Sequence, residues 1–311
     1  MKALFNSKFS DHKLSMMFVA ATELAVTVDD IPAHGAVPDG TTRRDVSAEM
    51  IRALERHSVS GVYGFTNGGQ LLEHPEREHI LKDWRRAGFF LTNHTLSHSD
   101  LTRLSAADYI ADIDRNESIL MRLSPHDAPK YFRYPYLHDG DTTAKRERVR
   151  SWLAARGYTI TPATISLDDD WSWNDIYVRC AALGDTHSIA RLKTLFLQSA
   201  MTRLKAFEEL SHQLFGRSIK HVLVVHMSAF EALMLDQLLA AYRAAGTTFV
   251  GLPVAMQDPA LRLDPGLVQE QGATLLVQIA QSRRVPIPDA LGSSPEELGR
   301  LCPSRSAQSP R

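Results

Sequence analysis

The sequence has few cysteines, no excess of charge of either sign and no long hydrophobic run. Its 311 residues include two cysteines, and 35 basic side chains balance 36 acidic ones. Two cysteines cannot form a disulfide framework, although they could form one bridge, so the redox compartment stays open. A balanced charge argues against a nucleic-acid partner, whose binding surface normally shows a basic excess. No run approaches the roughly 18 apolar residues that an integral membrane segment needs.

The remaining composition is that of a globular protein with a sizeable buried core. Hydrophobic residues make up 44% of the chain and charged residues 23%. The 17 glycines and 15 prolines are about a tenth of the residues, far below the levels of disordered or fibrous chains. The length suits roughly two average domains, but α/β barrels of this size commonly form one unit.

Short apolar runs alternate with helical patterns along most of the chain. The runs are rich in β-branched or aromatic residues, which is typical of strands buried on both faces. We expect strands at 24–28, 61–65, 89–92, 131–133, 158–160 and 222–225, and weaker ones at 163–167 and 248–252. Helical patterns lie between them at 45–56, 76–87, 105–122, 143–156, 187–214 and 229–245. Gly88, Gly157 and Gly246 stand where helix C-termini favour a residue with positive φ.

This alternation predicts an α/β protein with a parallel sheet, and the number of strands fits a barrel. A doubly wound open sheet would show the same alternation, because strand order cannot be read from the pattern. We expect one domain at 23–258, a lead-in at 1–22 and a C-terminal extension at 259–311. The prolines of the extension predict a partly irregular tail.

The first residues leave the location of the protein open. Three lysines precede an apolar stretch at 14–21 that ends in small residues, as a secretory signal would. Asp11 and His12 interrupt the lysine-rich approach, and the stretch is short for a signal core. The segment is therefore either a weak signal peptide or an irregular lead-in. Of the two locations, we favour export to the periplasm or beyond over the cytoplasm.

Reactive side chains follow five of the expected strands. In parallel α/β folds such groups gather at the carboxyl edge of the sheet. The candidates there are Asp29, Asp30, Asn93, His94, His98, Arg133, Tyr134, Asp168, Asp169, Asp170, Trp171 and His226. Their convergence is the main functional signal in the sequence.

Two of these groups indicate a metal site. His94 and His98 stand at i and i+4, so both imidazoles would project from one face of a helical turn. Two histidines and one carboxylate leave coordination positions open, as in catalytic metal sites. Asp29 and Asp30, adjacent on an extended segment, should point in opposite directions, so that one binds the metal and the other acts as a base on metal-bound water. Surface histidines and an acidic turn are the structural alternatives.

His226 lies at the end of an apolar run, where it could protonate a leaving amine. A carboxylate of the 168–170 run could keep it protonated. The alternative is a histidine buried in the core. Trp171 and Trp173 would be packing residues, or the apolar wall for a small acyl group.

The ordered set TVDDIP, HTLSH, FRYPY, DDDW and VVH resembles the five motifs of polysaccharide deacetylases, the NodB-homology group of carbohydrate esterase family four. The resemblance runs from about residue 24 to about residue 256. It implies a distorted, incomplete, TIM-like (β/α) barrel of about seven parallel strands, with 23–258 as the single catalytic domain. The implied activity is metal-dependent hydrolysis of N- or O-acetyl groups on sugars.

The resemblance also implies residue roles. Asp30, His94 and His98 would bind a divalent metal, most commonly Zn²⁺, with Co²⁺ or another transition metal as alternatives. Asp29 would be the general base, held by Arg133, and the backbone N–H of Tyr136 would help to hold the oxyanion. His226 would be the general acid, oriented by Asp170, with Asp168 and Asp169 as alternatives.

The chain departs from the family pattern at three positions. Ile31 and Pro32 follow the Asp pair, where the family usually has Gly. Tyr134 replaces the first Pro of the third motif, and Met227 follows His226, where an Asp is common. Neither of the first two substitutions removes a reacting group, whereas Met227 leaves the expected acid, His226, without an Asp that could tune its pKa.

Three functions fit these residues. The first is deacetylation of an acetylated glycan, the expected partner. The second is hydrolysis of a non-sugar amide at the same site, and the third is glycan binding by a catalytically weakened relative. Candidate substrate residues are Trp171, Tyr136, His34 and Asn67, the last two on polar loops at 34–44 and 67–74. The oligomeric state is not predicted.

Overall fold

The computed structural model describes residues 22–123, 130–167, 170–269, 271–291 and 296–302. Eight parallel strands form one sheet, with the order β5-β4-β3-β2-β1-β7-β6 and with β8 pairing beside β1. The strands are β1 (Glu23–Ile31), β2 (Tyr63–Thr66), β3 (Phe90–Asn93), β4 (Tyr131–Phe132), β5 (Thr159–Ile160), β6 (Ile165–Ser166), β7 (His221–His226) and β8 (Thr248–Phe249).

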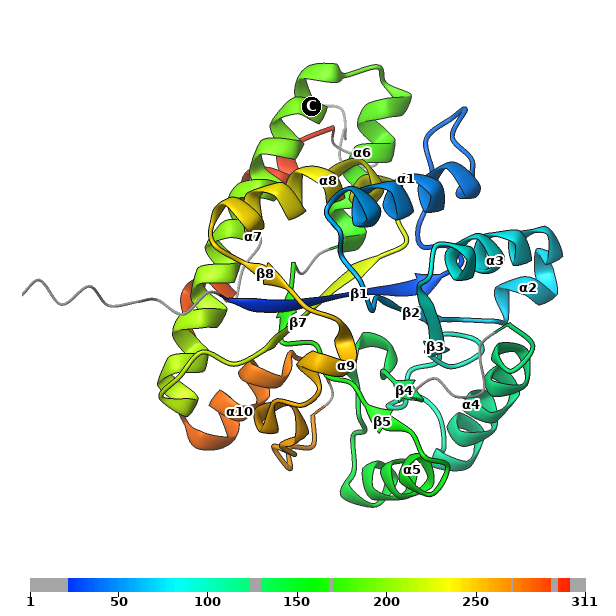
Figure 1. The fold of residues 1–311 in the computed structure, drawn as a ribbon, viewed down its shortest axis with the longest axis vertical. Helices are drawn as coiled ribbons and strands as arrows, with labels where there is room; N and C mark the ends of the chain where they lie inside the picture. Colours follow the sequence, from blue (N-terminus) through cyan, green and yellow to red (C-terminus); the bar gives the residue numbers. More distant parts are fainter. Residues whose placement is uncertain (1–21, 124–129, 168–169, 270, 292–295, 303–311) are drawn as a thin grey trace, which may run out of the picture.

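The strands form an incomplete barrel with the long strand β1 in the middle of the sheet (Figure 1). Within the described residues β5 and β6 are the two ends of the path, and no pairing joins them. Helices surround the strands, as connections between parallel strands require. The predicted distorted (β/α) barrel is confirmed. Each of the eight expected strands is present, and seven of them form the continuous path.

The longer helices are α1 (Arg43–Arg56), α3 (Glu78–Arg86), α4 (Ala106–Leu120), α5 (Thr143–Ala155), α6 (Asp170–Ala182), α7 (Thr186–Phe215), α8 (Ala229–Ala244) and α10 (Leu275–Arg283). Short helical pieces are α2 (Gln70–Glu73), α9 (Leu252–Ala255), η1 (Pro75–Arg77), η2 (Pro135–Leu137), η3 (Pro259–Arg262), η4 (Asp289–Leu291) and η5 (Glu296–Arg300). The sequence pattern did not predict α6 or α10. Among the described helices, none is long and apolar enough to span a membrane.

Local signals explain where the helices begin and end. Thr42 caps α1 in a capping box with Asp45, and the Ser105 side chain accepts the Asp108 N–H at the start of α4. Gly88, Gly157 and Gly246 have φ values of 84°, 76° and 92°, which end their helices as expected.

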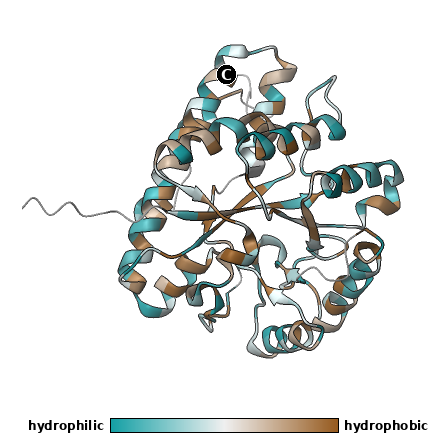
Figure 2. Cartoon of the chain, viewed as in Figure 1, coloured by the Kyte–Doolittle hydropathy of each residue, from teal (hydrophilic) through white to brown (hydrophobic). Residues whose placement is uncertain are grey.

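The core lies on both sides of β1. Leu24, Val26 and Val28 are buried, and so are the residues that alternate with them, because helices cover the sheet. Figure 2 shows the same arrangement, with hydrophobic colour on the central strands and hydrophilic colour on much of the helices around them. This burial fixes β1 and therefore fixes the two aspartates at its end.

The C-terminal part of the chain packs onto this core. Ala260 and Leu261 of η3 and Leu276 and Ile279 of α10 are buried in the main hydrophobic cluster. A disulfide joins Cys302 to Cys180 of α6. The extension is thereby attached covalently to the barrel.

Candidate metal centre and active site

Asp29 and Asp30 end β1 on the same side of the sheet. Asp29 Oδ2 lies 3.7 Å and Asp30 Oδ1 lies 3.6 Å from the Nε2 atom of His94. The expectation that the two carboxylates point in opposite directions is therefore wrong. Asp30 adopts a φ of 61°, and the β1–β2 register shifts between Val28 and Ile31, so the alternation of an extended strand ends there.

His94 and His98 follow β3 on an irregular loop rather than on the predicted helical turn. Thr95 and His98 have φ values of 64° and 54°, which bend the loop so that both rings face Asp30. His94 Nδ1 lies 2.9 Å from the backbone oxygen of Arg133, which can only accept a hydrogen bond. The proton therefore stays on Nδ1, and Nε2 is left to act as a ligand.

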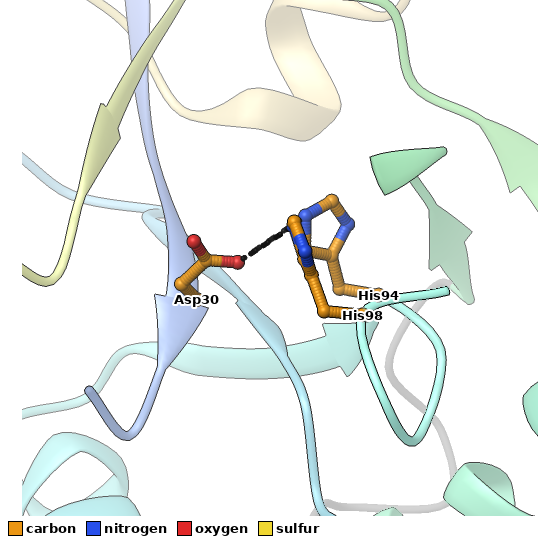
Figure 3. Close-up of side chains that lie close together, drawn as sticks. All are labelled: Asp30, His94 and His98. Carbon is orange, nitrogen blue, oxygen red and sulfur yellow. Dashed lines mark ion pairs between the residues drawn. The ribbon is translucent and has the colours of Figure 1, made fainter. Parts of the chain in front are cut away.

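Asp30, His94 and His98 form a donor set that fits a divalent metal (Figure 3). One ligand atom from each residue lies within 4.8 Å of the others, and His98 Nε2 is 3.2 Å from Asp30 Oδ1. Bonds of about 2.1 Å at tetrahedral angles separate ligand atoms by about 3.4 Å. Asp30 Oδ1 is buried without a hydrogen-bond partner among the described residues. A metal would satisfy this oxygen.

The protonation states of these groups suit metal binding. Burial lowers the pKa of His98 to about 4, so its imidazole is neutral at pH 7. Burial opposes ionisation of Asp30, but His98 and His34 beside it together hold its pKa well below the usual value. A neutral imidazole and an ionised carboxylate are the forms that coordinate a metal.

Arg133 follows β4 and holds Asp29. Its Nη1 atom donates to Asp29 Oδ1 at 2.6 Å and to Thr27 Oγ1 at 2.8 Å. The guanidinium is buried above the ring of Phe65, 4.2 Å from the ring centroid. Sequence reasoning missed Thr27, because its only signal is that of a β-branched residue in a strand.

His226 ends β7 as expected and pairs in register with Asp29 on the neighbouring strand. Its backbone N–H donates to the buried carboxylate of Glu231, a residue that sequence reasoning also missed.

Tyr136 has a φ of 57° and is 49% exposed, and its ring centroid lies 4.5 Å from that of His98. Its side chain therefore borders the candidate metal-binding residues.

The side chain of Asp170, the predicted orienting acid, lies outside the described part of the structure, and so do its alternatives Asp168 and Asp169. Asp168 and Asp169 are not among the described residues, and of Asp170 and Trp171 only the backbone is described, at the start of α6. Trp173 is in the core, stacked on Phe230. It is therefore a packing residue rather than a wall for the acyl group.

Two candidate substrate residues are buried and contact protein groups. Asn67 donates from Nδ2 to the backbone oxygens of His94, at 2.5 Å, and Thr95, at 3.1 Å, so it supports the histidine loop. His34 Nδ1 lies 2.5 Å from Asp30 Oδ2, so it contacts a residue of the candidate metal-binding set. Both side chains are buried.

Residues 19–152 match the polysaccharide deacetylase family. The chain is 31% identical over 114 residues to a peptidoglycan-N-acetylglucosamine deacetylase of Bacillus cereus, covering 37% of this chain and 36% of that protein. The chain spans about a third of the length of the curated relatives that it matches, between 30% and 36%.

Solved structures share the fold. One is the chitin deacetylase of Colletotrichum lindemuthianum, with a TM-score of 0.50 and 19% identity over 76% of this chain and 87% of that chain. Another is a carbohydrate esterase family four pseudoenzyme of Bacillus anthracis, with a TM-score of 0.52 and 13% identity over 76% of this chain and 66% of that chain. At these identities the likeness concerns the barrel alone.

Proposed function

We propose that the chain acts like the polysaccharide deacetylase family that its residues 19–152 match, and that it hydrolyses acetyl groups on N-acetylated sugars with a divalent metal. One observation carries the proposal. Ligand atoms of Asp30, His94 and His98 converge within 4.8 Å beside the buried Asp29–Arg133 pair. A three-ligand site next to a held carboxylate is typical of metal-assisted hydrolysis.

Asp30, His94 and His98 would hold the metal, and two nitrogens with one oxygen favour Zn²⁺, with Co²⁺ as a substitute. When bound, such a cation lowers the pKa of a coordinated water and polarises the acyl oxygen. The buried carboxylate of Asp30 would neutralise part of the charge of the cation. The partly exposed His98 leaves an approach for substrate from the side of Tyr136.

Asp29 would accept the proton of the attacking water. Arg133 occupies Asp29 Oδ1, whereas Asp29 Oδ2 faces the site, 3.7 Å from His94 Nε2. The charge-assisted hydrogen bond from the guanidinium restricts rotation of the carboxylate. Asp29 is therefore proposed as a base rather than as a second oxygen ligand.

His226 would protonate the leaving group from the neighbouring strand β7. An amine leaving group needs a proton before it departs, so an acid opposite the base suits N-acetyl substrates. The Tyr136 N–H would help to hold the developing oxyanion. The exposed ring of Tyr136, beside His98, offers a surface on which a sugar ring could stack.

The substrate and the location are part of the proposal. The relatives are named for peptidoglycan and chitin deacetylation, so an N-acetylglucosamine polymer or its oligomers are the substrates to test. Such polymers lie outside the cell membrane. The disulfide between Cys180 and Cys302 favours an oxidising compartment, and both points support export.

Hydrolysis of chitooligosaccharides and peptidoglycan, compared with that of small aliphatic amides, tests the proposal. We expect acetate release that is abolished by a chelator and restored by Zn²⁺ or Co²⁺. Asp30→Ala should lose both metal and activity. Asp29→Asn should keep the metal and lose about 10²–10⁴-fold in kcat, since it removes a general base.

Three outcomes would contradict parts of this reading. Undiminished turnover of Asp29→Asn would contradict the assignment of Asp29 as the general base. Cleavage of small amides but not of glycans would favour an amidohydrolase. Metal-loaded protein that binds chitooligosaccharides without cleaving them would favour a glycan-binding relative.

A further inference from the structure

The two oxygens of the Asp30 carboxylate have different partners. Oδ1 faces the Nε2 atoms of His98 and His94, at 3.2 Å and 3.6 Å. Oδ2 lies 2.5 Å from Nδ1 of His34. An ionised carboxylate accepts hydrogen bonds only, so the proton of this contact is on His34 Nδ1.

The loop that carries His34 is fastened at successive residues. The backbone oxygens of Ala33, His34 and Ala36 accept from Gln70 at 2.8 Å, Arg43 at 2.9 Å and Asn174 at 3.0 Å, respectively. The same Arg43 also donates to the Gly35 oxygen. These donors come from α2, α1 and α6, so three separate helices hold this one loop.

A fourth contact fixes the same loop from the sheet side. The His34 N–H donates to the Met227 oxygen just beyond β7, at 2.9 Å. The imidazole is buried, and its centroid lies 4.9 Å from that of the His226 ring. With backbone and ring both fixed, His34 has little freedom to turn away from Asp30.

We infer that His34 is a positioning residue that holds Asp30 Oδ2, so that Oδ1 alone is presented to the metal. The inference rests on the proposed function, because it takes Asp30 as a metal ligand. A carboxylate with two unbound oxygens can rotate or chelate through both of them. A hydrogen bond to one oxygen selects single-oxygen coordination and fixes its direction. His34 thus acts on the metal through Asp30.

A pair of substitutions separates this role from packing. In His34→Asn the side-chain amide can stand near the place of Nδ1 and donate to Oδ2. In His34→Gln the amide reaches towards the place of Nε2, and the contact is lost. We expect His34→Gln and His34→Ala to weaken Zn²⁺ binding about 10–100-fold, and His34→Asn to recover most of the loss.

The readout is the Zn²⁺ dissociation constant of the whole chain, measured by competition with a chromogenic chelator and independent of activity. The absorption spectrum of the Co²⁺-loaded protein reports any change of coordination. His57→Gln is the matched control, since His57 Nε2 also contacts an aspartate, Asp236, at 3.0 Å, but at the end of α1. Thermal unfolding of the metal-free variants checks that they fold.

The outcomes are distinct. If His34→Ala and His34→Gln bind Zn²⁺ as tightly as the wild type, the positioning role is overturned. It is also overturned if His34→Asn folds but binds Zn²⁺ as weakly as His34→Ala. A wild-type chain that binds no Zn²⁺ would overturn the metal centre and this inference together. Tight binding with the expected His34 pattern but no deacetylation would support the inference and contradict the proposed function.

Discussion

At the scale of single residues, Arg133 brings a full positive charge into the buried centre of the barrel. Its Nη1 atom contacts Asp29 and Thr27, and its Nε atom donates to the Thr161 oxygen at 3.3 Å. Burial lowers the pKa of Arg133, whereas the negative charge of Asp29 raises it. The ion pair thus offsets part of the cost of burying the guanidinium.

Arg133→Lys should keep the charge and lose the geometry. A lysine ammonium has no planar fork, so it cannot contact Asp29, Thr27 and Thr161 from the same positions. We expect kcat to fall by about 10-fold or more, with the Zn²⁺ dissociation constant unchanged, because no metal ligand is altered. Steady-state kinetics with chelator competition measure both quantities. An active variant with weakened metal binding would instead place Arg133 among the supports of the ligands.

The residues that form the site could be predicted from the sequence, but the directions in which their side chains point could not. Strand ends marked Asp29, Asp30, His94 and His226 as neighbours. The left-handed backbone of Asp30 could not be predicted, since Asp29 and Asp30 were expected on an extended segment. His34 was assigned to a polar loop, because its contacts with distant helices exist only after folding.

At the scale of elements, the turn that carries Tyr136 depends on a distant glycine. Tyr136 and Leu137 both have positive φ, 57° and 56°, in the short helix η2. A Cβ placed on Gly272 would lie 1.9 Å from the Tyr136 oxygen and 2.6 Å from the Leu137 carbonyl carbon. The segment before α10 therefore lies directly against the proposed oxyanion turn.

Gly272→Ala should move that turn. No real Cβ approaches backbone so closely, so either the turn or the extension must shift. We expect kcat for deacetylation to fall by about 10–100-fold, part of the loss that follows removal of an oxyanion donor. The Zn²⁺ dissociation constant should stay unchanged. Gly299→Ala is the control, since its Cβ would have nothing within 4 Å. Equal kcat values for the two variants would show that the extension does not affect catalysis.

The strands could be predicted because each is a short apolar run between turn signals. The helix α10 could not, since prolines on either side of it suggested irregular chain. Its helical state depends on burial of Leu275, Leu276 and Ile279 against the barrel, not on local propensity. The weak strands β6 and β8 have two residues each and depend likewise on their neighbours.

At the scale of the whole molecule, the C-terminal extension packs where the sheet stays open. The Leu275 N–H donates to the Ala163 oxygen, at 2.9 Å, in the connection between β5 and β6. Arg146 of α5 contacts both Asp264 of the extension, at 3.0 Å, and Asp139, at 2.8 Å. The extension therefore supplies packing and ion pairs along the side that lacks strand pairing.

The disulfide between Cys180 and Cys302 should contribute strongly to stability. It links residues 122 positions apart, so it restricts a long segment of the unfolded chain. We expect the double variant Cys180→Ala/Cys302→Ala to lose about 2–5 kcal/mol of unfolding free energy in urea titrations. A reductant should lower the wild type to about the same level and leave the variant unchanged.

In this experiment the Zn²⁺ dissociation constant shows whether loss of the disulfide affects only the stability of the whole chain or also the proposed metal site. No metal ligand contacts either cysteine among the described contacts, so the folded variant should bind Zn²⁺ like the wild type. A stability that does not respond to reductant would contradict the bridge and remove one support for export. A response confined to stability would mean that an oxidising compartment preserves the fold, while the site at the end of β1 works independently of it.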